Sequence, residues 1–216
     1  MLIIGAKGFA KEVLEVLFQN KIEEDIYFFD NVNNDIPDYV YEKFKVIRTF
    51  EAVTELFKSS GMNGFTAGIG KPVNRFKLSL KFIELGGIFT STISPLAAIG
   101  HFDNFIGAGS NIMTGSVLTN SIQIGKGALV NLNCTIGHDC TIGRFIEMSP
   151  GVHISGNCII GEFVNIGTNA TILPKIKIGD NVTIGAGAVV TKDIPSNSLA
   201  VGIPAKVIKE IPEIIF

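Results

Sequence analysis

The sequence predicts an α/β lobe followed by a parallel β-helix, and three observations indicate this. From residue 106 to residue 184, every sixth residue is aliphatic or Met. Residues 1–90 lack this repeat and instead alternate short apolar runs with helical apolar stripes. Glycine makes up 24 of 216 residues, above the usual share of about 7%, which suits a chain with many tight corners. We therefore expect two domains, at residues 1–90 and 91–216.

The first domain shows the order of elements expected of a parallel α/β sheet. Apolar runs at 2–4, 27–31 and 65–70 are predicted to be strands. A helical stripe at 13–18 follows the first run, and a helix is predicted from Val73 to Leu85. This strand-helix-strand alternation is typical of parallel sheets with covering helices.

A glycine loop of the form G-x-x-G-x-A, at residues 5–10, joins the first strand to the first helix. Such a position at a helix start favours an anion site, although a tight turn without a ligand has the same appearance. Asp30 ends the second strand, where an acidic residue often meets a ribose. A solvated loop carboxylate is the alternative for Asp30.

The second domain repeats with a period of six, which fits a short strand plus a tight corner. Three such units close a triangular coil of about 18 residues, and stacked coils bury each other's faces. Four residues after each aliphatic position stands a small or modest side chain, which should also face inward. Cys134, Cys140 and Cys158 all occupy this position, so we expect them to be core thiols. Ile93 and Ile99 are one residue out of frame, which predicts a slip at residue 105 or 106. The aliphatic positions in frame are Ile106, Ile112, Leu118, Ile124, Val130, Ile136, Ile142, Met148, Ile154, Ile160, Ile166, Ile172, Ile178 and Ile184.

Composition disfavours several classes of protein. The net charge is −2 with no long basic run, so nucleic acid is not an expected partner. No apolar run reaches the roughly 18 residues of a membrane span, and the N-terminus lacks the charged region of a secretory signal. Three cysteines without CxxC spacing argue against a zinc site or a disulfide framework. A cytoplasmic protein without a bound metal is therefore expected.

The hexads resemble those of the hexapeptide-repeat acyltransferases. The whole chain is similar to the bacterial sugar acetyltransferases of the sialic acid O-acetyltransferase type, the NeuD/PglD type, which include N-acetyltransferases of UDP-4-amino sugars. The resemblance implies a left-handed parallel β-helix, acetyl-CoA as co-substrate and a nucleotide-sugar acceptor. It also implies a homotrimer whose active sites are shared between chains. The segments that carry it are 5–10, 30–31, 68–70, 131–139, 149–151, 155–157 and 202–206.

In this family the first domain holds the nucleotide sugar. Matching positions implicate Lys7, Gly8, Phe9, Asp30, Asn31 and Gly70. Some relatives carry His in place of Phe9 and a second acidic residue in place of Asn31.

The catalytic candidate is His138, followed directly by Asp139. Acyl transfer to an amine or a hydroxyl needs a base, and an unperturbed imidazole, with a pKa of about 6.5, suits that role at neutral pH. An adjacent carboxylate can orient the ring and stabilise the imidazolium. In the family, His at this position is the base and the acidic residue after it supports it. On position alone, a surface histidine on a coil corner remains the alternative.

Two further residues match positions near the family's active centre. Asn131 is one, with a solvent-facing turn residue as the alternative. Gly156 is the other, where a backbone N–H can hydrogen-bond the thioester carbonyl; corner geometry alone also favours glycine there. His101 and His153 match no catalytic position and are expected on the surface or in loops.

The resemblance also implies positions along acetyl-CoA. They are Glu147, Thr168, Gly185, Ala186 and Lys206. Glu147 stands where some relatives carry a His that touches acetyl-CoA. Small residues let the cofactor approach the backbone, but β-helix corners need them as well. Lys206 is expected to pair with a CoA phosphate or to be solvated.

The expected trimer has support in the sequence, because Leu129, Leu132 and Phe145 fall at outward positions of the repeat. We predict acetyl-CoA-dependent N-acetylation of a nucleotide-linked amino sugar in bacterial surface glycan synthesis. O-acetylation of sialic acid or of another sugar hydroxyl is the alternative within the same class. A non-catalytic scaffold, or a metal protein of the γ-carbonic anhydrase type, is disfavoured because the three histidines have mismatched offsets in the repeat.

Overall fold

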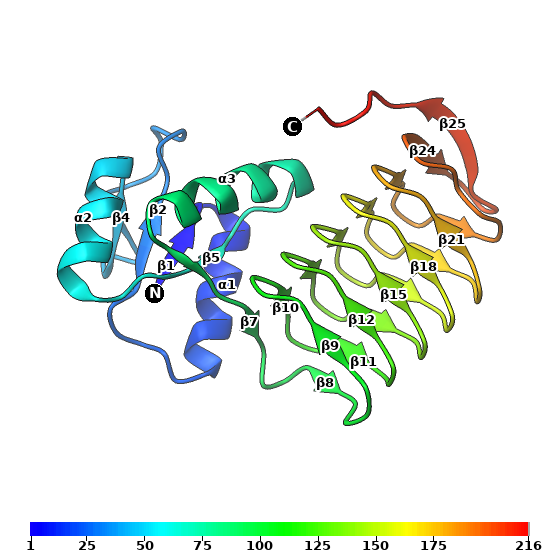
Figure 1. The fold of residues 1–216 in the computed structure, drawn as a ribbon, viewed down its shortest axis with the longest axis horizontal. Helices are drawn as coiled ribbons and strands as arrows, with labels where there is room; N and C mark the ends of the chain where they lie inside the picture. Colours follow the sequence, from blue (N-terminus) through cyan, green and yellow to red (C-terminus); the bar gives the residue numbers. More distant parts are fainter. Residues whose placement is uncertain (216) are drawn as a thin grey trace.

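The computed structural model describes residues 1–215 and contains the two predicted parts (Figure 1). The N-terminal lobe has a six-stranded sheet in the order β3-β4-β2-β1-β5-β6. Its strands are β1 Leu2–Ile4, β2 Tyr27–Phe29, β3 Tyr39–Val40, β4 Phe44–Ile47, β5 Gly64–Ala67 and β6 Ile88–Phe89. Its helices are α1 Gly8–Gln19, α2 Phe50–Ser60 and α3 Pro72–Glu84.

The sheet of this lobe is parallel except for β3, which is antiparallel to β4. The central strand β1 pairs with β2 and β5 in parallel, with Leu2 opposite both Tyr27 and Phe65. Both faces of β1 are buried because α1 covers one and α2 and α3 pack with the other. All-parallel central strands are expected to read as continuous apolar runs, as β1 does.

Helix α2 and strands β3 and β4 were not predicted from the sequence. A signal for α2 was present, since Thr49 caps its N-terminus by accepting a hydrogen bond from Ala52 N at 3.2 Å. Gly61 closes the C-terminus with φ +68°, a left-handed conformation that glycine adopts without strain. Val53 and Phe57 lie between these caps at helical spacing and are buried.

The second part is a parallel β-helix of short strands in three sheets, which confirms the predicted fold. The predicted slip is confirmed as well, because β8 and β9 are separated by one residue more than the repeat requires. The two-residue strands are β7 Thr92–Ile93, β8 Ala98–Ile99, β9 Phe105–Ile106, β10 Asn111–Ile112, β11 Val117–Leu118, β12 Gln123–Ile124, β13 Leu129–Val130, β14 Thr135–Ile136, β15 Thr141–Ile142, β16 Glu147–Met148, β17 His153–Ile154, β18 Ile159–Ile160, β19 Asn165–Ile166, β20 Thr171–Ile172, β21 Lys177–Ile178, β22 Thr183–Ile184 and β23 Val189–Val190. An antiparallel pair, β24 Ser198–Val201 and β25 Lys206–Glu210, ends the last coil.

Each sheet of the β-helix forms one face of the prism. We call them the C face (β7, β10, β13, β16, β19, β22, then β24 and β25), the D face (β8, β11, β14, β17, β20, β23) and the E face (β9, β12, β15, β18, β21). The inward residues form one apolar cluster along the axis. The three cysteines lie in it, and burial raises the pKa of Cys134 to about 11, so this thiol stays protonated at neutral pH.

The N-terminal lobe packs on the C face and on the corner between the E and C faces. Leu129 is buried against Val16 and Met113, while the ring of Phe145 contacts Phe76 at a centroid distance of 5.1 Å. Leu129 and Phe145 therefore meet the chain's own lobe. Their use as evidence for contacts between chains was wrong, because periodicity tells which side a residue faces and not what covers it.

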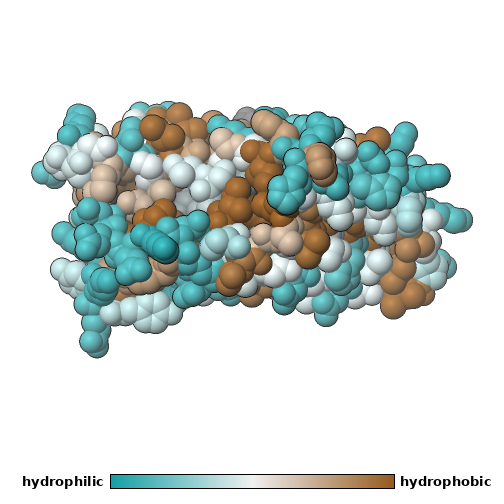
Figure 2. Space-filling model, turned by 90° about the horizontal axis from the view of Figure 1, so that it is seen from below, coloured by the Kyte–Doolittle hydropathy of each residue, from teal (hydrophilic) through white to brown (hydrophobic). Residues whose placement is uncertain are grey.

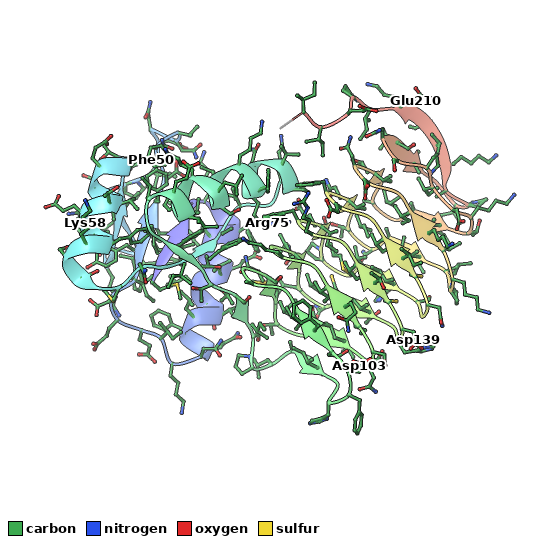
Figure 3. All side chains as sticks on the ribbon, viewed as in Figure 1. Phe50, Lys58, Arg75, Asp103, Asp139 and Glu210 are labelled. Atoms are coloured by element: carbon green, nitrogen blue, oxygen red, sulfur yellow. The ribbon has the colours of Figure 1, made fainter. Side chains whose placement is uncertain are left out.

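Arg75 joins the two parts at their interface (Figure 3). It is fully buried on α3, and its Nε donates to Gly127 O at 2.8 Å. Its two terminal nitrogens donate to the carbonyl oxygens of Ile69, Gly70 and Ile146. Burial lowers the pKa of Arg75 to about 10, although the nearby Glu147 charge opposes this, so the guanidinium remains charged at neutral pH.

We expect Arg75→Met to destabilise the protein by about 3 kcal/mol or more, because buried carbonyls would lose their donors. The melting temperature should fall by about 10 °C in a chain of this length. Thermal unfolding followed by circular dichroism measures this. Lys81→Met, an exposed change on the same helix, is the matched control, and an equal effect of the two variants would contradict the assigned role.

Candidate active site

A cavity lies at the carboxyl ends of β1, β2 and β5, where ligands bind in parallel α/β sheets. Its volume is about 500 Å³. Five of the six residues expected to hold the substrate line it, and Gly8 is not among the lining residues. The five are Lys7, Phe9, Asp30, Asn31 and Gly70.

The charges around this cavity favour an anion. Lys7, Lys71 and Lys77 line it. Helices α1 and α3 both begin at its edge, and neither has a side-chain cap on its N-terminal N–H groups. Uncapped helix N-termini and lysines together attract phosphate groups. The site therefore suits a ligand with an anionic part and an apolar or ring-shaped part, which Phe9 and Phe29 can contact.

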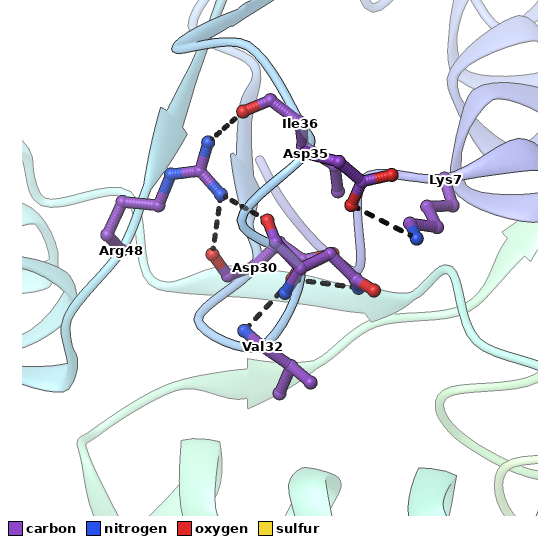
Figure 4. Close-up of polar contacts among 7 residues, drawn as sticks. Lys7, Asp30, Val32, Asp35, Ile36 and Arg48 are labelled. Carbon is purple, nitrogen blue, oxygen red and sulfur yellow. Dashed lines mark hydrogen bonds and ion pairs between the residues drawn. The ribbon is translucent and has the colours of Figure 1, made fainter.

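Asp30 organises the loop beside the cavity (Figure 4). Its Oδ1 accepts hydrogen bonds from Val32 N at 3.1 Å and Asn33 N at 2.9 Å, and its Oδ2 accepts from Asn33 Nδ2 at 3.0 Å. Burial alone would raise the pKa of Asp30, but hydrogen bonds from Asn33, Val32 and Ala6 outweigh it and lower the pKa. The reading of Asp30 as a solvated carboxylate was wrong, since only 6% of the residue is exposed.

Arg48 holds the same loop from the other side and was missed in the sequence. Its guanidinium donates to Asp30 O at 3.2 Å, to Asn33 O at 3.1 Å and to the carbonyls of Ile36 and Pro37. A cation directly after a buried strand was the signal, but its partners lie 11 to 18 residues away. Arg48 and Asp30 thus fix the edge of the cavity without depending on a ligand.

His138 and Asp139 form a dyad on the corner between the D and E faces. Nδ1 of His138 lies 2.7 Å from Oδ2 of Asp139, and both side chains are more than half exposed. If Asp139 accepts the Nδ1–H, the lone pair of Nε2 is available to take a proton. The carbonyl of His138 accepts a hydrogen bond from Asn157 N at 2.8 Å, which anchors the corner to the next coil. In Figure 3 Asp139 lies at the edge of the β-helix away from the lobe.

Gly156 lies directly beneath the imidazole. A Cβ added to Gly156 would be 2.7 Å from Nε2 of His138, closer than real contacts allow. The absence of a side chain therefore leaves room for the ring, in addition to any role of the backbone N–H.

We expect Gly156→Ala to lower kcat by at least about tenfold with the fold intact, because the methyl group would displace the imidazole from its position. Steady-state kinetics with circular dichroism measure both. Pro174→Ala, at the equivalent corner one coil further on, is the matched control. Wild-type kcat in Gly156→Ala would show that the ring position is unimportant.

The other candidate residues lie on a different corner, between the C and D faces. Coils stack every 18 residues, as the pairing of Leu129 with Glu147 shows. Asn131 and Gly185, which are three coils apart, consequently occupy equivalent positions in the stack. Thr168 and Ala186 are one coil apart and share the next position along the corner. Gly187 N donates to Thr168 O at 2.8 Å, which joins these coils. The D face separates this corner from His138, so one chain does not bring the two sets together.

The side chain of Asn131 is largely used by the corner itself. It is 9% exposed, and its Oδ1 accepts a hydrogen bond from Leu132 N at 2.7 Å. Lys206 begins β25 beyond the last coil and is exposed. Glu147 belongs to neither corner: it projects from the C face beside Gly70.

Residues 1–215 contain no group of three or more His, Cys, Asp or Glu side chains arranged to hold a metal ion. His153 is exposed, and its Nδ1 lies 2.9 Å from Thr135 Oγ1. His101 is exposed in the segment between β8 and β9 that contains the one-residue slip. Within the same residues, no helix combines the length and the apolar character needed to cross a bilayer.

Comparisons with known proteins agree with this geometry. The PglD N-terminal domain matches residues 1–82, and the bacterial transferase hexapeptide (six repeats) matches residues 157–192. No curated protein matches the sequence.

Several solved structures are similar over almost the whole chain. The acetyltransferase domain of PglB from Neisseria gonorrhoeae FA1090, in complex with acetyl coenzyme A, is 33% identical over 96% of this chain and 98% of its own, with a TM-score of 0.87. A histidine-to-asparagine mutant of perosamine N-acetyltransferase from Caulobacter crescentus, in complex with CoA and GDP-perosamine, is 28% identical over 97% and 96%, with a TM-score of 0.88. WeeI from Acinetobacter baumannii AYE is 28% identical over 96% and 98%, with a TM-score of 0.85.

An α/β lobe with an anion cavity, a hexapeptide β-helix and an exposed His–Asp dyad together define a hexapeptide-repeat acyltransferase. The sequence identity of 33% with the PglB acetyltransferase domain, over 96% of this chain, identifies the family within this class. The chain belongs to the PglD-type hexapeptide sugar acetyltransferases.

Proposed function

We propose that the protein transfers the acetyl group of acetyl-CoA to the amine of a nucleotide-linked amino sugar. The observation that carries this is the His138–Asp139 dyad, whose Nε2 is open above Gly156. Residues 1–90 bind the nucleotide sugar in the lysine-lined cavity, and residues 91–216 bind acetyl-CoA and carry the base. The complexes of the relatives with acetyl coenzyme A and with CoA and GDP-perosamine support both ligands. Use of acetyl-CoA and three reduced core thiols are consistent with a cytoplasmic enzyme of surface glycan synthesis.

The reaction needs one base and no covalent intermediate. Nε2 of His138 takes a proton from the sugar amine as its nitrogen attacks the thioester carbonyl carbon. Asp139 accepts the Nδ1–H and stabilises the imidazolium that forms. The C–N bond forms, the C–S bond breaks, and the proton passes from His138 to the thiolate to give free CoA. The N–H of Gly156 stabilises the oxyanion of the tetrahedral intermediate.

We further propose a homotrimer in which two chains complete each site. The catalytic corner and the corner with Thr168, Gly185 and Ala186 lie at opposite edges of the D face. When three D faces surround a threefold axis, the catalytic corner of one chain meets the acetyl-CoA corner of the next. Apolar side chains reach the surface of the face drawn in Figure 2. On the D face and its two corners, the first coils expose Leu96, Phe102 and Val117, which can pack between chains.

A free-thiol assay of CoA release tests the proposal. Acetyl-CoA is offered with GDP-perosamine, with a UDP-4-amino-4,6-dideoxy sugar, or with free or CMP-linked sialic acid. Release with either amino sugar supports N-acetylation. Release only with sialic acids would replace it with O-acetylation, and no release with any acceptor would reject the proposed acceptor class.

A further inference from the structure

Glu147 lies where the lobe meets the β-helix. It projects outward from β16 on the C face, and a Cβ added to Gly70 would lie 2.8 Å from its Oε1. Gly70 itself lines the nucleotide-sugar cavity. Glu147 is not among the residues that line the cavity, but its carboxylate lies next to one that does, on the side of the β-helix.

This carboxylate has no bonded partner within the described part of the chain, and its side chain is partly buried. No hydrogen bond or ion pair joins it to another residue among 1–215, and its neighbour Arg75 uses its guanidinium on four backbone carbonyls. Burial raises the pKa of Glu147, and the charge of Arg75 opposes that rise. The carboxylate oxygens of Glu147 therefore have no donor from the described residues and are open to a ligand that carries N–H groups.

The position of Glu147 is also where the two substrates should meet. On one side of it lies Gly70, which lines the cavity. On the other side, two residues along the chain, Ser149 begins the corner that continues in later coils to Gly167 and Gly185. Acetyl-CoA laid along that corner would bring its thioester towards Glu147, as the sugar leaves the cavity from the opposite direction.

We propose that Glu147 binds the ammonium group of the acceptor and makes the enzyme specific for an amino sugar over its hydroxyl counterpart. This inference rests on the proposed function and names a specificity-determining residue for it. An ammonium supplies the N–H donors that the carboxylate lacks, with opposite charge. A thioester carbonyl has only acceptor atoms, so an ionised Glu147 does not complement it. The ammonium releases one proton to water before the free amine attacks, and His138 takes the second during attack.

The test compares wild-type protein with Glu147→Gln, which keeps the size of the side chain and removes its charge. The assay uses whichever amino sugar, GDP-perosamine or the UDP-linked sugar, the wild-type enzyme acetylates. We expect the KM for the amino sugar to rise about 10- to 100-fold, the loss typical of a hydrogen bond to a charged group. The KM for acetyl-CoA should stay unchanged.

A second measurement separates recognition of charge from a structural role. The hydroxyl analogue of the same nucleotide sugar is used as a competitive inhibitor, and its Ki should be equal for wild type and Glu147→Gln. Glu162→Gln, which removes an exposed carboxylate paired with Arg144, is the control and should match wild type. An unchanged amino-sugar KM, a raised acetyl-CoA KM or a parallel rise of Ki and KM would overturn the inference. Failure of the wild-type enzyme to use any amino sugar would instead reject the proposed function.

Discussion

Replacing His138 with alanine should lower kcat by a factor of about 10²–10⁴, the usual loss on removing a general base. The reason lies in the dyad: Oδ2 of Asp139 is 2.7 Å from Nδ1 of His138, so the ring is held with Nε2 available as the base. The KM for the nucleotide sugar should change little, because the cavity residues lie in the other lobe. Steady-state CoA release under saturating substrates measures both constants.

The matched control for this variant is His101→Ala, which removes another exposed histidine from the β-helix. It should retain wild-type kcat. The kcat of Asp139→Asn should lie between those of His138→Ala and His101→Ala, because an amide still orients the ring but no longer stabilises the imidazolium by charge. A loss below about tenfold in His138→Ala would reject its assignment as the base.

The β-helix could be predicted from the sequence because its core is periodic. Each inward position repeats every six residues, and small side chains such as Cys134 and Cys140 occupy the second inward position, where they are buried. The one-residue slip between Ile99 and Ile106 was visible for the same reason. A strict repeat leaves few alternative registers, so local pattern and global fold agree.

The α/β lobe was only partly predictable. Helix α2 carries a weak apolar stripe, Val53 and Phe57, and its best signals are the caps Thr49 and Gly61. The contacts of Arg48 and Arg75 could not be predicted, because both bond to backbone carbonyls that the fold alone brings into reach. Because every residue carries a backbone carbonyl, the sequence does not indicate which carbonyls accept these hydrogen bonds.

The candidate site also contains some features that the sequence predicts and others that it does not. Sequence reasoning found the His138–Asp139 dyad because the two residues are adjacent, and their side chains lie in contact. It placed Glu147 along acetyl-CoA by matching positions with relatives, which stays a prediction, and it did not reveal that the carboxylate lies beside Gly70. That contact joins residues of different domains, so neither local sequence nor repeat offset reveals it.

Two inactive variants mixed before assembly should regain activity if neighbouring chains share each site. His138→Ala lacks the base, and Ala186→Trp should block the exposed acetyl-CoA corner with a bulky ring. In a random 1:1 mixture, a site is intact when its base comes from one variant and its corner from the other. Each condition holds for half of the chains, so about a quarter of the sites should be active.

The experiment unfolds and refolds the two variants together, with each refolded alone as the control. Light scattering checks that every sample is trimeric. Each variant refolded alone should show almost no CoA release, so any activity of the mixture stands out clearly from this background. A site formed within one chain would carry one defect in every copy, and mixing would then restore no activity. A fully active monomer would likewise contradict the shared site, because the D face keeps His138 apart from Ala186 in each chain.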